Sequence, residues 1–300
     1  MTQKKILITG ANGFLGQFLV RDLWQKGYEV IATGKGENRL PFTYTERFTY
    51  DTLDIGKSAS VHSVFDKHKP NLVIHAAAIT QVDDAERNTE LAEQINVQGT
   101  AEVLVDAETY AEYILFISTD FVFDGNKGMY EEEDDLQPLS FYGFTKMQAE
   151  AIMSTAEIPY SIVRTCLVYG KPLSGARSNI IQWVSGKLQA NEAIKVVNDQ
   201  VRTPTYVEDL SKAIVQLVEQ RLTGIYHISG KEVFTPYEMA VATANYLGAD
   251  TSLITPVDAS TFKEVGKRPL KTGFSIKKAE TLIGFQPVSF QEALIKIFEQ

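Results

Sequence analysis

The chain has 300 residues, of which 44% are hydrophobic and 22% are charged, with 20 Gly and 10 Pro. This composition excludes a mainly disordered or collagen-like protein, and the length suits one large globular domain or two smaller ones. Asp and Glu number 38 against 29 Lys and Arg, a net charge of −9, so nucleic acid is not an expected partner.

Short β-branched and aromatic runs alternate with amphipathic stretches over the first 170 residues. The expected strands are residues 4–8, 28–33, 47–51, 71–75, 113–118 and 160–164. The expected helices are residues 14–26, 58–67, 90–108 and 141–156. Strands that alternate with helices of crossover length predict an α/β fold, a doubly wound Rossmann domain with a parallel sheet.

The pattern changes after Gly170. A loop at residues 171–178 is followed by a helix to about Ala190 and then by short strands and helices. This predicts a smaller α/β substrate-binding domain, with a cleft between the two parts. The predicted division gives residues 1–172 to the dinucleotide-binding domain, with 205–230 returning to it, and residues 173–204 and 231–300 to the second domain.

Glycines cluster where the first strand ends and the first helix begins, in the sequence Thr9-Gly10-Ala11-Asn12-Gly13-Phe14-Leu15-Gly16. Glycines at such a turn let the backbone approach a pyrophosphate, and the helix N-terminus supplies free N–H groups and a positive dipole. Glycine is also common in purely structural turns, but the strand-turn-helix context favours a dinucleotide site.

The end of the second predicted strand indicates which dinucleotide binds. An NAD site usually has Asp or Glu there to hold the ribose 2′-hydroxyl, whereas this chain has Thr33-Gly34-Lys35. Lys35 and Arg39 favour a 2′-phosphate and therefore NADP(H), although both also suit a solvated surface. Glu37 keeps NAD(H) open as a less favoured alternative.

Tyr142-Gly143-Phe144-Thr145-Lys146 is the only Tyr-x-x-x-Lys in a chain with 13 tyrosines. Four residues apart on a helix, the two side chains share a face, and an ammonium there stabilises tyrosinate and lowers the pKa of the phenol. Ser118-Thr119-Asp120 ends the fifth predicted strand, where ligands meet doubly wound sheets. Thr119 could therefore bind the oxygen that Tyr142 protonates, although such residues also cap helices and form turns.

Cysteine and histidine usage argues against metal and disulfide chemistry. Cys166 is the single cysteine, and the four histidines show no HExxH spacing, so no metal site is expected. No apolar run approaches the ~20 residues of a membrane span, and no signal peptide is evident. The expectation is a cytoplasmic protein that does not contact the membrane.

The motifs TGANGFLG, HAAA, STD, YGFTK and VRT together resemble those of the extended short-chain dehydrogenase/reductases. The likeness is closer to the dTDP-4-dehydrorhamnose reductase branch and spans nearly the whole chain. The motifs that carry the closer likeness are AAAITQVDDAE (76–86), STDFVFDG (118–125), VVNDQ (196–200), TPT (203–205) and RPLKT (268–272).

The resemblance implies an NADPH-dependent reduction of a nucleotide-linked 4-keto-6-deoxy sugar by a homodimer. Thr119, Tyr142 and Lys146 match the catalytic trio of the family. The cofactor-binding residues would be Gly10, Asn12, Gly13, Phe14, Leu15, Gly16, Lys35, Arg39, Asp54, Ile55, Ala76, Ala77, Ala78, Asn96, Ser118, Tyr142, Lys146 and Thr165. The substrate-binding residues would be Thr80, Asp120, Val122, Leu167, Arg202, Thr205 and Arg268.

The family also implies individual roles. Asp54 and Ile55 would flank the adenine, and Ala76–Ala78 would lie beneath the ribose on the nicotinamide side. Asn96 would support Lys146 through water, and Lys146 would hold the hydroxyls of that ribose.

Four positions depart from the family pattern. Phe14 replaces a glutamine of the glycine loop, and Cys166-Leu167 replaces a Ser-Trp pair whose tryptophan is expected to line the sugar pocket. Arg202 is unusual between Gln200 and Thr203, and both a contact with a substrate phosphate and a structural salt bridge are open for it. The same two roles are open for Arg268.

Two other functions stay open. A nucleotide-sugar epimerase would use the same Tyr and Lys but return its hydride within one cycle. The non-catalytic regulatory subunit of methionine adenosyltransferase shares the fold and serves as a binding partner. A dehydratase is disfavoured, because that class places Glu where this chain has Phe121.

Overall fold

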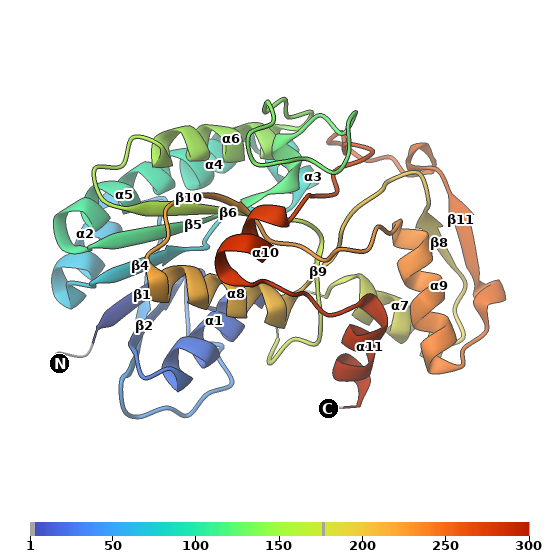
Figure 1. Ribbon diagram of the computed structural model, residues 1–300, viewed down its shortest axis with the longest axis horizontal. Helices are drawn as coiled ribbons and strands as arrows, with labels where there is room; N and C mark the ends of the chain where they lie inside the picture. Colours follow the sequence, from blue (N-terminus) through green and yellow to red (C-terminus); the bar gives the residue numbers. More distant parts are fainter. Residues whose placement is uncertain (1–3, 176–177, 300) are drawn as a thin grey trace.

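The computed structural model describes residues 4–175 and 178–299. Its centre is a sheet of seven parallel strands in the order β10-β6-β5-β4-β1-β2-β3 (Figure 1). The strands are β1 (Lys5–Thr9), β2 (Glu29–Gly34), β3 (Phe48–Thr52), β4 (Leu72–His75), β5 (Tyr113–Thr119), β6 (Tyr160–Thr165) and β10 (Gly224–His227). The six strands expected from the sequence form within one residue of their predicted ends, and the α/β fold class is confirmed.

Alternate residues of β1 show how the sheet is buried on both faces. Ile6 and Ile8 point into a core shared with α1 and α8, whereas Leu7 points into the core formed by α2, α5 and α6. This alternation is the period of two that a strand imposes on its side chains. Figure 1 shows the two helical layers on opposite sides of the sheet. The helices are α1 (Phe14–Gln25), α2 (Ser58–His68), α5 (Gly99–Tyr110), α6 (Phe141–Met153) and α8 (Val207–Gln220).

The helix expected over residues 90–108 is interrupted. It consists of α4 (Thr89–Glu93), the π-helical turn η1 (Gln94–Gln98) and α5. π-helical turns insert one extra residue and often occur at functional sites. Here the turn contains Asn96, whose side chain binds the loop after β4.

Much of the chain after β6 forms a second layer beside the carboxyl ends of the strands (Figure 1). A small parallel pair joins β8 (Ile194–Val197) to β11 (Ile254–Val257), and α7 (Ile180–Gln189) and α9 (Pro236–Leu247) pack over it. A second pair joins β7 (Val168–Tyr169) to β9 (Thr205–Tyr206). The remaining elements are α3 (Val82–Arg87), η2 (Asp120–Val122), η3 (Thr251–Leu253), η4 (Ala259–Thr261), α10 (Lys277–Ile283) and α11 (Phe290–Phe298).

Residues 176 and 177 of the predicted loop lie outside the described residues. Among the described residues, no helix combines the length and the apolar character that a membrane crossing needs.

Candidate active site

The glycine loop between β1 and α1 is tightly packed against backbone. Gly10 has φ +72°, and a Cβ there would lie 2.9 Å from the backbone of Ala77. A Cβ on Gly16 would lie 2.3 Å from the carbonyl oxygen of Gly10. Gly13 precedes α1 and provides no side-chain cap, and the first turn carries no acidic residue. The loop therefore forms a cradle whose free N–H groups suit an anionic phosphate.

A cavity of about 260 Å³ opens at the carboxyl ends of β1, β2 and β4. It brings together six residues expected to bind the cofactor: Gly10, Lys35, Asp54, Ile55, Ala77 and Ala78. Its size and its position beside the glycine loop fit the adenosine part of a dinucleotide.

Lys35 and Arg39 are the cations expected to bind the 2′-phosphate. Lys35 lines this cavity, and Arg39 lies in the loop that follows β2. Lys35 Nζ is 3.1 Å from Asp54 Oδ2, and its side chain is 75% exposed. The Arg39 and Glu37 side chains are exposed. Asn12 fixes the loop that carries them: its Oδ1 accepts from the Arg39 N–H at 3.0 Å and its Nδ2 donates to the Glu37 carbonyl at 3.0 Å.

Tyr50 is a residue of this region that sequence reasoning missed. Its hydroxyl accepts from Asn12 Nδ2 at 2.8 Å and donates to the carbonyl oxygen of Gly36 at 3.0 Å. The isolated tyrosine on β3 belongs to no motif, so only the fold brings it to the cofactor loop.

Asn96 connects the segment after β4 to α6, the helix that carries Tyr142 and Lys146. Its Oδ1 accepts from the Ile79 N–H at 2.8 Å, and its Nδ2 donates to the Ile79 carbonyl and to Thr145 Oγ1, both at 3.0 Å. Thr9 Oγ1 holds the start of the same segment by accepting from the Ala76 and Ala77 N–H groups. These bonds fix residues 76–79 beside α6.

Thr119, Tyr142 and Lys146 come together at the carboxyl end of β5. Tyr142 and Lys146 lie one turn apart on α6, and Ser140 caps the helix by accepting from the Gly143 N–H at 3.1 Å. A Cβ on Gly143 would lie 2.1 Å from the carbonyl oxygen of Phe121, so this glycine lets α6 approach η2.

The electrostatics differ from the sequence expectation. Burial raises the pKa of the Tyr142 phenol, the hydrogen bond with the Thr119 hydroxyl opposes this rise, and the Asp120 carboxylate adds to it. Burial also lowers the pKa of Lys146 to about 7, against the opposing effect of Glu150. The expected lowering of the phenol pKa is therefore wrong, because desolvation is the largest contribution and the Asp120 carboxylate acts in the same direction. The phenol stays protonated, as a proton donor must.

A buried ionic network joins α6 to β6 and was missed from the sequence. Arg164 Nη2 donates to Glu150 Oε2 at 2.7 Å, and both side chains are nearly inaccessible. Ser118, expected to contact the cofactor, donates its hydroxyl proton to the same carboxylate. Thr165 Oγ1 donates to Thr205 Oγ1 at 3.1 Å. Glu150 follows Lys146 by four residues, so its side chain lies on the same face of α6 as Tyr142 and Lys146.

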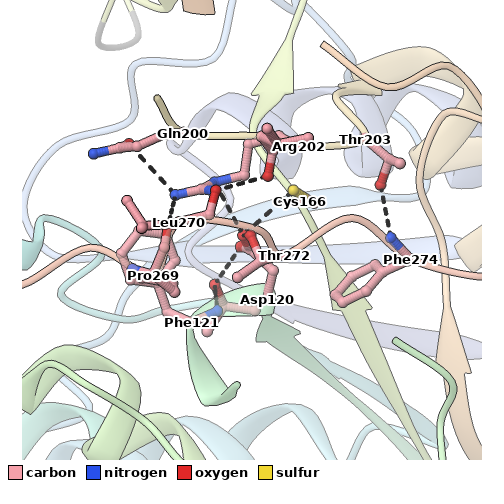
Figure 2. A network of polar contacts seen from close by, with 12 residues as sticks. Asp120, Phe121, Cys166, Gln200, Arg202, Thr203, Pro269, Leu270, Thr272 and Phe274 are labelled. Carbon is pink, nitrogen blue, oxygen red and sulfur yellow. Dashed lines mark hydrogen bonds and ion pairs between the residues drawn. The ribbon is translucent and has the colours of Figure 1, made fainter. Parts of the chain in front are cut away.

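Asp120 and Arg202 are partners of each other. Asp120 Oδ2 accepts from the Thr272 hydroxyl and from Cys166 Sγ at 3.3 Å, and it lies 3.5 Å from Arg202 Nε (Figure 2). The other four Arg202 donors bind Gln200 Oε1 and three backbone carbonyls. With every donor engaged within the chain, Arg202 offers none to a substrate phosphate, so its placement favours the structural salt bridge.

The remaining expected substrate contacts are dispersed. Arg268 Nη1 donates to Asp83 Oδ1 at 2.7 Å, and its Nε lies 3.4 Å from Glu264 Oε1. Val122 is fully buried in the core and presents no surface to a ligand. Thr80 is exposed, and Leu167 is partly buried with φ +37°.

Comparisons with known proteins show which family the chain belongs to. A model of the family described as RmlD substrate binding domain matches residues 4–300. The chain belongs to this family. A dTDP-4-dehydrorhamnose reductase from Aggregatibacter actinomycetemcomitans is 31% identical, with 98% of each chain covered. The resemblance to the dTDP-4-dehydrorhamnose reductase branch of the extended short-chain dehydrogenase/reductases is thus confirmed.

Solved structures of RmlD family members share the fold. A dTDP-4-dehydrorhamnose reductase from Bacillus anthracis, solved in complex with NADP, superposes with a TM-score of 0.86 at 30% identity and 99% coverage of both chains.

A further relative by sequence has a different name. Methionine adenosyltransferase 2 subunit beta from Bos taurus is 29% identical over 93% of this chain and 82% of its own length.

Proposed function

We propose that this protein is an NADPH-dependent reductase of a nucleotide-linked 4-keto-6-deoxy sugar. The observation that carries the proposal is the meeting of Thr119, Tyr142 and Lys146 at the end of β5, in a fold whose glycine loop packs too closely against backbone to admit larger side chains. The relatives named dTDP-4-dehydrorhamnose reductase, one of them bound to NADP, support both the reaction and the cofactor.

The residues of the chain fit a bound dinucleotide. Gly10, Gly13 and Gly16 would hold the pyrophosphate, Asp54 and Ile55 the adenine, and Lys35 with Arg39 the 2′-phosphate. When bound, NADPH supplies the hydride for the keto carbon.

Tyr142 is the proton donor of the proposed reaction. Its phenol is buried and protonated, and it donates its proton to the substrate oxygen as that oxygen gains negative charge. Thr119 orients the same oxygen from the end of β5. Lys146 holds the ribose hydroxyls, and when protonated it stabilises the phenolate left on Tyr142.

The second layer would hold the nucleotide end of the substrate. We assign residues 1–172 and 205–230 to the dinucleotide-binding domain and residues 173–204 and 231–300 to substrate binding. A homodimer in the cytoplasm remains our working assignment for the active form.

The decisive experiment follows NADPH absorbance after addition of a dTDP-4-keto-6-deoxy sugar. We expect stoichiometric NADPH consumption by the wild type and a loss of about 10²- to 10⁴-fold in rate for Tyr142→Phe. Tyr246→Phe, which changes a tyrosine on α9 that bonds Glu299, is the matched control and should react as the wild type does. Equal rates for Tyr142→Phe and wild type would reject the role of Tyr142, and turnover without net NADPH consumption would indicate an epimerase.

A second candidate is a regulatory subunit, favoured by the likeness to methionine adenosyltransferase 2 subunit beta. It predicts no turnover on any keto sugar and recovery of a stoichiometric enzyme partner in a pull-down. The intact catalytic trio is compatible with that role but is not required by it, so the reductase remains the preferred function.

A further inference from the structure

Arg202 is a buried arginine whose guanidinium contacts several other parts of the chain. Its side chain is 5% exposed. Nη1 donates to the carbonyl oxygens of Val201 at 2.9 Å and Leu270 at 3.1 Å. Nη2 donates to the carbonyl oxygen of Pro269 at 2.7 Å and to Gln200 Oε1 at 3.4 Å. Nε faces the Asp120 carboxylate, so a single guanidinium serves as a junction between several segments (Figure 2).

The segments that meet at Arg202 are distant in sequence. Asp120 directly follows catalytic Thr119, whereas residues 200–203 and 269–272 belong to the second layer. Backbone hydrogen bonds already join the two second-layer segments: the Val201 N–H donates to the Leu270 carbonyl, and the Thr272 N–H donates to the Val201 carbonyl. Arg202 and the Thr272 hydroxyl then attach this paired unit to Asp120.

The same junction touches the wall of the active site. The Arg202 guanidinium lies 5.8 Å from the centroid of the Phe121 ring, and that ring contacts the Tyr142 ring at 5.9 Å between centroids. A displacement of Arg202 therefore moves a neighbour of the proton donor as well as the second layer.

We propose that Arg202 is a positioning residue, which holds segments 200–203 and 269–272 against Asp120 and so sets how the sugar nucleotide is presented to Tyr142. This inference rests on the proposed reductase function. The planar fork of the guanidinium is essential to it, because a lysine has the charge but cannot reach three carbonyls and a carboxylate at once.

The test uses Arg202→Met and Arg202→Lys, with the surface residue change Arg221→Met as the matched control. We expect Arg202→Met to lower kcat/KM for the keto sugar by about 10²-fold, as a misplacement of about 1 Å does. Arg202→Lys should fall between Arg202→Met and the wild type. The dissociation constant for NADPH should be unchanged in all variants, because the glycine cradle lies between β1 and α1 and Arg202 does not line the cavity beside it. Arg221→Met should behave as the wild type.

Hydrogen exchange tests the positioning role of Arg202 independently of the proposed reductase function. Residues 200–203 and 269–272 should exchange faster in Arg202→Met even if the wild type proves to have no reductase activity. If Arg202→Met does not fold, Asp120→Asn/Arg202→Met removes the unpaired buried carboxylate, and this variant together with Arg202→Lys decides the question. Folded variants with wild-type kinetics and unchanged exchange, or a loss that follows NADPH affinity alone, would overturn the proposal.

Discussion

The Lys146 ammonium donates to the carbonyl oxygen of Ile117 at 2.7 Å. It also lies 3.9 Å from the centroid of the Phe116 ring. The lysine is thus held by the strand that ends in Thr119. A bound ribose would give the same ammonium further hydrogen-bond partners and would replace the water lost by burial.

The lowered pKa of Lys146 predicts a stability change with pH. Between about pH 7 and pH 10.5 the folded protein has released a proton that the unfolded chain still holds. The free energy of unfolding therefore rises with pH over this window as far as Lys146 is concerned. Lys146→Met should reduce this rise, measured by denaturant unfolding at several pH values. If the free energy of unfolding had the same pH dependence in the wild type and in Lys146→Met, burial would not lower the pKa of Lys146 as described.

Cofactor selectivity should depend on Lys35 and Arg39. Alanine at both positions is expected to weaken NADPH more than NADH, because only NADPH carries the 2′-phosphate. Direct titration of each nucleotide measures the effect, and Lys26→Ala on the distant end of α1 serves as control. A greater loss for NADH would instead favour Glu37 as a ribose ligand.

The glycine cradle predicts contrasting effects of two Gly→Ala changes. Gly16→Ala places a methyl group 2.3 Å from the Gly10 carbonyl oxygen and should cost about 1–3 kcal/mol of stability as well as cofactor affinity. Gly186→Ala meets no atom within 4 Å on α7 and should raise stability by about 0.4–1 kcal/mol. Thermal unfolding of both variants, with and without NADPH, checks the contrast. If both changes have the same sign, the close approach at Gly16 is not as described.

The Glu150–Arg164 pair predicts strong coupling between two buried charges. Glu150→Gln or Arg164→Met alone should destabilise the protein by about 3–5 kcal/mol, because each leaves a buried charge without its partner. The double variant should lose less than the sum of the two single losses. A double-mutant cycle from denaturant unfolding gives the coupling free energy, and additive losses would show that the pair does not act as a unit.

Arg268 separates a structural role from a binding role. Its ion pair with Asp83 joins residues 264–268 to α3, and the guanidinium holds the pKa of Asp83 below its ordinary value. If the arginine is structural, Arg268→Ala should lower the melting temperature and leave the affinity for free dTDP unchanged. Intact stability with weaker dTDP binding would restore the substrate contact expected from the sequence.

Local patterns predicted the first six strands and the glycine loop because these depend on neighbours in sequence. Alternating burial and the strand-turn-helix placement of Gly10–Gly16 are visible in a short window. The π-helical turn at Asn96 was not predicted, since its helix has ordinary apolar spacing and the break depends on contacts with Ile79 and Thr145.

Long-range pairing also explains the missed side-chain roles. Arg202 and Arg268 are cations of the type that bind phosphate, yet each finds carboxylate partners, Asp120 and Asp83, that are far away in sequence. The raised pKa of Tyr142 has the same origin, because burial is decided by the whole fold and the Tyr-x-x-x-Lys spacing carries no information about it.

The contact between Asp120 and Thr272 has a consequence for the order in which the protein is made. The two residues are 152 positions apart, and nearby the Tyr130 N–H donates to the Gly273 carbonyl. In a chain leaving the ribosome, the strands β1 through β6 can assemble into a sheet and the glycine cradle can form while residues beyond 270 are still untranslated. Until those residues emerge, the Asp120 carboxylate lacks the Thr272 hydroxyl. The strands β1–β6 and the glycine loop can therefore be complete before the segment that carries Thr272 joins Asp120.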